Sequence, residues 1–161
     1  MDTTRTHTPP RTRSTPLTQS LYIGLALQIL CIGIPLLDLL AFNTIESHVQ
    51  AAYPDWSGDQ VQLDTTAIAI GLVIITALGV LAWAVALLVT RRGRFGRSTV
   101  TTMFIIGLCV AGSVIGMGGG AYERFAPLWI SLTLFIVPLL PGLTALVAAW
   151  YPPTARDRAV A

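Results

Sequence analysis

The chain has 161 residues, of which 53% are hydrophobic and 11% are charged, and its formal net charge is +2. Soluble domains carry about 25% charged residues, so this chain has too little charge to cover a water-soluble globule. The same composition excludes a disordered chain, which would be polar and rich in charge. Two cysteines are too few for a disulfide-stapled scaffold or a multi-cysteine zinc domain. These numbers therefore predict an integral membrane protein.

The chain opens with a segment rich in threonine, proline and arginine, residues 1–16, which we expect to be a disordered cytoplasmic tail. Four apolar segments follow at 17–42, 66–90, 99–117 and 127–150, each close to the roughly 20 residues that a membrane-spanning helix needs. They are apolar on all sides and do not alternate, so they predict helices and not barrel strands. We therefore expect an all-α fold, an antiparallel bundle of four transmembrane helices over 17–150, with an outer loop at 43–65 and a cytoplasmic C-terminal tail at 151–161.

Arginines are distributed unequally between the flanks of these spans. The chain has ten Lys or Arg residues, all of them arginine, and Arg124 is the only one between the third and fourth spans. The other nine precede the first span, join the second to the third, or follow the fourth: Arg5, Arg11, Arg13, Arg91, Arg92, Arg94, Arg97, Arg156 and Arg158. Because short arginine-rich flanks stay in the cytoplasm, we predict a multi-pass membrane protein with both termini cytoplasmic.

The outer loop contains two helix-start signals. Asn43 with Glu46 three residues later is similar to a capping box and predicts a short helix from about Thr44 to Ala52. Pro54 should end it, because proline biases the residue before it away from helical geometry. Ser57 with Gln60 forms a second capping box, so the next helix should begin near Gly58. Its first turns would then stand clear of the bilayer.

Asp38 is the only acidic or basic side chain within the four predicted spans. An acid inside a membrane is a candidate functional site, for example a carrier of protons or cations. Asp38 lies about one helical turn from the outer boundary, so an interfacial acid, paired with Arg124, is the structural alternative. Small multidrug transporters also have four spans, but they place an acid near the middle of the first one, where this chain has Gln28 and Cys31.

The remaining candidates for chemistry are few. Cys31 and Cys109 lie near the middle of their spans without a nearby cysteine, which is typical of small buried hydrophobes. His48 stands near Glu46 and two loop aspartates, but the spacing does not present three ligands on one face. The arginine-rich connection at 91–97 lacks the broad basic surface and aromatics of a nucleic-acid site. We expect no enzymatic activity, no metal or other cofactor, and no nucleic-acid partner.

Small residues recur in the third span and beyond it. Gly112, Gly116 and Gly120 are four residues apart, and Gly107 with Ala111 forms a second pair. Such a stripe lets another backbone approach closely, and we favour packing inside the bundle over a homo-oligomer face. Prolines at 35, 138 and 141 should kink the first and fourth spans, which either opens a polar crevice or fits the bundle.

Several features together resemble a known group of sequences. They are the loop sequence SHVQAAYPDW beginning at Ser47, the capped start of the second span, the RRGRFGRS turn beginning at Arg91, and the proline-containing last span. These are similar to small uncharacterised four-helix membrane proteins predicted from actinobacterial genomes. The resemblance implies a bacterial plasma membrane and nothing about chemistry.

Two functional hypotheses follow from the sequence. The first is a non-enzymatic accessory or interaction protein that contacts a membrane-protein partner through its outer loop and bundle within the lipid bilayer. The alternative is a small oligomeric transporter or channel. In that case Asp38, Gln28, Thr76 and Ser113 would be the polar groups of its path.

Overall fold

The computed structural model describes residues 16–92 and 96–151, and within them the fold is all-helical apart from an isolated bridge between Gly119 and Tyr122. In chain order the elements are α1 (Pro16–Leu37), the π-helical turn η1 (Asp38–Phe42), α2 (Thr44–Ala52), α3 (Gly58–Arg91), α4 (Gly96–Gly116) and α5 (Leu128–Trp150). The expected tails at 1–16 and 151–161 lie almost wholly outside the described residues.

Four helices are long and apolar enough to cross a membrane, as the composition predicts. They cover Pro16–Phe42, Gly58–Arg91, Arg97–Gly116 and Leu128–Trp150. The second begins at Gly58, where the Ser57–Gln60 capping box predicts it, and the Ser57 backbone N–H donates to Gln60 Oε1 over 3.0 Å. The polar first turns of α3 therefore extend a helix that is apolar farther along. These four helices are consistent with a multi-pass membrane protein.

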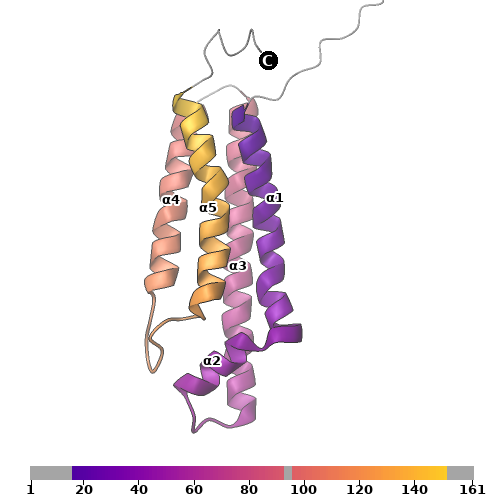
Figure 1. Cartoon of the computed structure of the whole chain (residues 1–161), viewed down its shortest axis with the longest axis vertical. Coiled ribbons are helices and arrows are strands. Elements are labelled where there is room, and N and C mark those ends of the chain that lie inside the picture. Colours follow the sequence, from indigo (N-terminus) through magenta and orange to yellow (C-terminus); the bar gives the residue numbers. More distant parts are fainter. Residues whose placement is uncertain (1–15, 93–95, 152–161) are drawn as a thin grey trace, which may run out of the picture.

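The four long helices lie side by side and run alternately down and up in the view of Figure 1, so that α1 begins and α5 ends at the same end of the bundle. Each packs against two neighbours in the cyclic order α1, α3, α4, α5. The α1–α5 and α1–α3 pairs are the most closely packed, and α3–α4 is the least. Helix α2 lies across the lower end of the bundle, against the start of α3.

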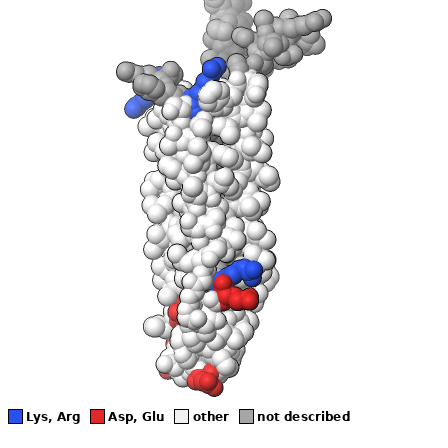
Figure 2. All heavy atoms as spheres, turned by 90° about the vertical axis from the view of Figure 1, so that its left-hand side faces the viewer, with Lys and Arg blue, Asp and Glu red and all other residues white. Residues whose placement is uncertain are grey.

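The two ends of the bundle differ in charge. We call the end that holds Arg91, Arg92 and Arg97 the arginine end. The opposite end, formed by α2, the start of α3 and the α4–α5 connection, is the acidic end, and its exposed acids are Glu46, Asp55, Asp59 and Glu123. The face in Figure 2 carries basic atoms at one end and, toward the other end, acidic atoms with some basic atoms beside them. A long uncharged surface lies between the two ends. Such a surface suits a hydrocarbon environment.

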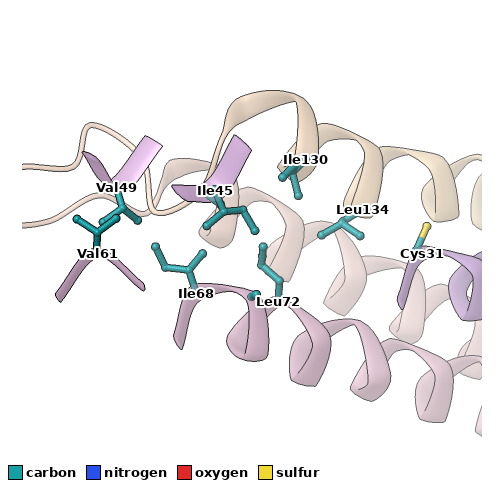
Figure 3. Packing of buried hydrophobic residues seen from close by; sticks show 10 residues of the cluster. Cys31, Ile45, Val49, Val61, Ile68, Leu72, Ile130 and Leu134 are labelled. Atoms are coloured by element: carbon teal, nitrogen blue, oxygen red, sulfur yellow. The ribbon is translucent and has the colours of Figure 1, made fainter. Parts of the chain in front are cut away.

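The buried hydrophobic residues form two clusters, one toward each end. The cluster at the acidic end joins α1, α2, α3 and α5 (Figure 3). In it Ile45 and Val49 of α2 pack among residues of α3 and α5: Val61, Ile68, Leu72, Ile130 and Leu134. The cluster at the arginine end consists of Leu21, Ala86, Leu87, Val100 and Ala145. Short helix α2 thus contributes to the hydrophobic core.

Candidate functional site

The first candidate is the corner where α1 turns into α2. Here α1 widens into the π-helical turn η1, which closes with the Asn43 N–H donating to the Asp38 carbonyl over 2.8 Å. Asn43 then adopts a left-handed conformation, with φ 52°, which asparagine tolerates better than most residues. The chain reverses at this point, and α2 begins at Thr44.

Asp38 is completely buried in this corner, with 0% of its surface exposed. Its carboxylate accepts the backbone N–H groups of Thr44, over 3.2 Å, and Ile45, over 2.9 Å, and also the Thr44 hydroxyl. The first N–H groups of a helix have no partner within the helix and carry partial positive charge. Asp38 therefore caps α2 from the end of the preceding helix, and its negative charge is stabilised by those groups.

This arrangement differs from two of the expectations for Asp38 and Asn43. Helix α2 has the predicted bounds, but Asn43 makes no side-chain cap, and Asp38 performs that role. Arg124, the expected partner of Asp38, instead has its Nη1 3.9 Å from Glu123 Oε2. The sequence contains an acid six residues before Thr44, but this spacing predicts a cap only if a π-helical turn lies between Asp38 and Thr44.

The second candidate is the buried contact between α1 and α3. Gln28, 7% exposed, donates from Nε2 to the Thr76 carbonyl over 3.1 Å, and the Thr76 hydroxyl donates to the Leu72 carbonyl over 2.6 Å. A Cβ atom on Gly79 would lie 2.5 Å from Gln28 Nε2, so this glycine makes room for the amide. Of the four polar groups considered for a transport path, Gln28 and Thr76 meet, Asp38 lies in the α2 corner, and Ser113 is exposed on α4.

The predicted small-residue stripe divides into three parts. Ala111 is buried, and a Cβ on Gly107 would touch Leu139 of α5 at 3.8 Å. Gly112 and Gly116 are exposed, and a Cβ on either would meet nothing within 4 Å, so the expected packing inside the bundle is not seen at these two positions. Gly120 lies beyond the end of α4, with φ 58°. The stripe predicted from spacing is therefore not one packed surface.

A close approach of helices occurs instead at a glycine that the spacing does not single out. A Cβ on Gly24 of α1 would lie 2.3 Å from Trp83 of α3, so the indole ring packs directly on the α1 backbone. The sequence signal is weak, because the four-residue spacing extends from Gly24 only back to Ser20, and Gln28 interrupts it on the other side. Which residue of α1 lies at the close approach depends on how α1 and α3 are rotated about their axes.

The third candidate is an aromatic cluster at the acidic end, consisting of His48, Tyr53, Trp56 and Tyr122. The rings of Tyr53 and Trp56 stack at 3.9 Å, Tyr122 meets Tyr53 edge-on at 5.1 Å, and His48 stacks on Tyr122 at 5.5 Å. The Tyr122 hydroxyl donates to the Asp64 carboxylate. Burial, together with this carboxylate, raises the pKa of Tyr122 above its ordinary value.

Backbone contacts attach the α4–α5 connection to this aromatic cluster. The Ala121 N–H donates to the Tyr53 hydroxyl over 3.1 Å. His48 Nε2 lies 2.8 Å from the Arg124 carbonyl, which can only accept, so this nitrogen carries the proton. The acidic end is therefore one connected unit made from α2, the start of α3 and the α4–α5 connection.

The remaining candidates are the two cysteines and the possible metal ligands. Cys31 is buried and Cys109 exposed, and both are free thiols. Among the described residues no three His, Cys, Asp or Glu side chains gather in a way that could hold a metal ion. No family model, curated protein or solved structure matches the chain. The resemblance to actinobacterial four-helix proteins therefore stays a prediction.

Proposed function

We propose that the chain is a non-enzymatic, multi-pass protein of the plasma membrane, with both termini in the cytoplasm, that acts as an accessory or interaction partner of another membrane protein. The observation that carries this proposal is the use made of Asp38. It is the only acidic or basic side chain within the four predicted spans, and its carboxylate is fully buried against the start of α2. By capping α2, Asp38 fixes the position of this helix at the acidic end.

The acidic end is the contact surface we propose. Three of its exposed acids, Glu46, Asp55 and Asp59, lie on α2, the following turn and the first turn of α3. The aromatic cluster and the Asp38 cap hold these elements together, so little ordering would be needed on binding. A partner with a basic surface would be attracted to them.

Photo-crosslinking tests this proposal in cells that express the chain. A photoreactive amino acid replaces Asp55 at the acidic end, and the matched control replaces Leu81, an exposed apolar residue of α3. We expect one discrete adduct from position 55 and no adduct of that mass from position 81. The double substitution Glu46→Gln with Asp59→Asn should lower the yield of the adduct from position 55. Absence of the adduct, together with solute flux by the purified protein in liposomes, would overturn the proposal.

The second candidate function is an oligomeric transporter or channel. It is favoured by Gly112 and Gly116, which face outward and leave a flat strip on α4 where a second copy could pack. In that case Gly116→Leu should convert an oligomer in detergent into a monomer, and Asp38→Asn should abolish any flux. A wild-type chain that is already monomeric would remove the support for this candidate.

A further inference from the structure

A cavity of about 500 Å³ lies among the four long helices. Its lining includes Leu21, Val100 and Ala145 of the cluster at the arginine end and Leu134 of the cluster at the acidic end. Protein interiors are close-packed and have few voids larger than a water molecule. A cavity of this size, within the range of ligand-binding pockets, therefore indicates an occupant.

The lining of the cavity is almost entirely hydrocarbon. Gln28 and Trp83 are the described lining residues with an amide or a ring N–H, and the Gln28 Nε2 already donates to the Thr76 carbonyl. Apolar cavities stay dry and take up apolar molecules. The occupant is thus recognised by hydrocarbon contact along most of its length.

The cavity opens sideways, between α3 and α4. Leu78 of α3 and Ile106 of α4 both line it, yet they are 59% and 50% exposed, which places them at its mouth. These two helices are also the least closely packed neighbours in the bundle. The mouth faces the uncharged band of the bundle, where a spanning protein contacts bilayer hydrocarbon. Lipid chains therefore have direct access to it.

The length and position of the cavity match one leaflet. Its lining runs along α3 from Ile75 to Ala86, which at 1.5 Å per residue is about 16 Å, or about half the hydrocarbon thickness of a bilayer. One end of the cavity lies near the arginine end of the bundle, because Val100 lines the cavity one turn after Arg97. On α3, Arg91 follows Ala86 by about a turn and a half. Its guanidinium donates to the hydroxyl of Tyr22 of α1, and its guanidinium carbon lies 5.2 Å from the centre of that ring.

We propose that this cavity binds one acyl chain of an anionic phospholipid from the leaflet at the arginine end. The chain enters between Leu78 and Ile106, and the phosphate lies near Arg91 and Arg97. Hydrocarbon contact holds the chain, and the two arginines select the negative headgroup. This site is independent of the proposed interaction at the acidic end.

Fluorescence quenching of Trp83 tests the proposal in vesicles. The other three tryptophans, Trp56, Trp129 and Trp150, are replaced by phenylalanine. Phosphatidylglycerol with bromine atoms on one acyl chain is added at a low mole fraction to unlabelled phosphatidylcholine, and brominated phosphatidylcholine serves as the neutral comparison. We expect quenching by the brominated phosphatidylglycerol at fractions where the phosphatidylcholine has no effect.

Two substitutions on α4 provide the matched pair. Gly107 lines the cavity, and a Cβ there would meet only Leu139 at 3.8 Å, so Gly107→Leu should fill the space without breaking the helix. Gly112→Leu adds the same side chain to the same helix on an exposed face. We expect the first to abolish selective quenching and the second to leave it unchanged.

A separate double substitution tests the selection of the headgroup. Arg91→Gln with Arg97→Gln should lower the preference for phosphatidylglycerol about tenfold. Three results would overturn the proposal: equal quenching by the two brominated lipids, no quenching by either, or equal quenching in the Gly107→Leu and Gly112→Leu variants. The last would place the bromine on the outside of the bundle.

Discussion

Asp38 and Gln28 share one property at the level of single residues: each is a buried polar side chain whose hydrogen bonds go mainly to backbone atoms of another element. Leaving a buried polar group unpaired costs about 1–3 kcal/mol, so these contacts fix how the elements meet. Both residues were predicted as candidates from their place in a span, but their partners were not. The partners are distant in sequence or lie across a turn, and no spacing rule connects them.

The contact between Gln28 and Gly79 predicts a coupling between the two positions. Gly79→Ala places a methyl group 2.5 Å from Gln28 Nε2 and should displace the amide from the Thr76 carbonyl, lowering the free energy of unfolding by about 1 kcal/mol. In a Gln28→Ala background the same change should be neutral or stabilising, because alanine favours helix over glycine by about 1 kcal/mol. Unfolding of the four variants in detergent measures the coupling, and equal effects in both backgrounds would contradict it.

Tyr122 predicts a dependence of stability on alkaline pH. Burial and the hydrogen bond to Asp64 raise its pKa in the folded state, so the neutral hydroxyl is favoured there. Its contribution to stability is therefore complete below about pH 10, where an unfolded tyrosine is still protonated, and is lost as the pH rises toward the folded-state pKa.

Thermal unfolding between about pH 9 and 11 should show this loss in the wild-type chain and a smaller one in Tyr122→Phe. Absorbance of the tyrosinate ion gives the matched measurement. Asp64→Asn should lower the pKa of Tyr122 toward the ordinary value, because it removes the charge that disfavours ionisation. Identical alkaline profiles for the wild type and Tyr122→Phe would rule out this role.

At the level of elements, signals contained in a few neighbouring residues predicted the helix bounds correctly, although the side-chain cap expected from Asn43 did not form. The Ser57–Gln60 pair gave the start of α3, the proline at position 54 gave the end of α2, and the apolar runs gave the four long helices. Each depends on local hydrogen bonding, backbone geometry or hydropathy, which the sequence carries directly. The faces of α4 were not predictable, because the rotation of a helix about its axis depends on every helix packed against it.

The α4–α5 connection depends on glycine at position 120. Its φ is 58°, and a Cβ there would lie 2.5 Å from the Tyr53 hydroxyl oxygen. Gly120→Ala should therefore lower the free energy of unfolding by about 1–3 kcal/mol and loosen the contact with Tyr53. Gly119→Ala is the control, since a Cβ at that position meets nothing within 4 Å. Unfolding in detergent compares the two, and equal effects would show that this turn tolerates a side chain.

The whole molecule has an arginine end and an acidic end separated by apolar helices. The distribution of arginines predicts that the acidic end is outside the cell. In a chain with Cys31→Ser and Cys109→Ser, a membrane-impermeant maleimide should label Asp55→Cys in intact cells. It should label Ser98→Cys, at the arginine end, only after permeabilisation. The reverse pattern would invert the topology and place the proposed contact surface in the cytoplasm.

The central claim is that the carboxylate of Asp38 serves as a structural cap that joins α2 to the bundle. Hydrogen–deuterium exchange of the Thr44 and Ile45 amides, in the wild type and in Asp38→Asn reconstituted in lipid nanodiscs, tests it most directly. An asparagine amide cannot accept both N–H groups as the carboxylate does, so both amides should be protected in the wild type and exchange faster in the variant. Unchanged exchange would contradict the claim and return Asp38 to the candidates for a transport role.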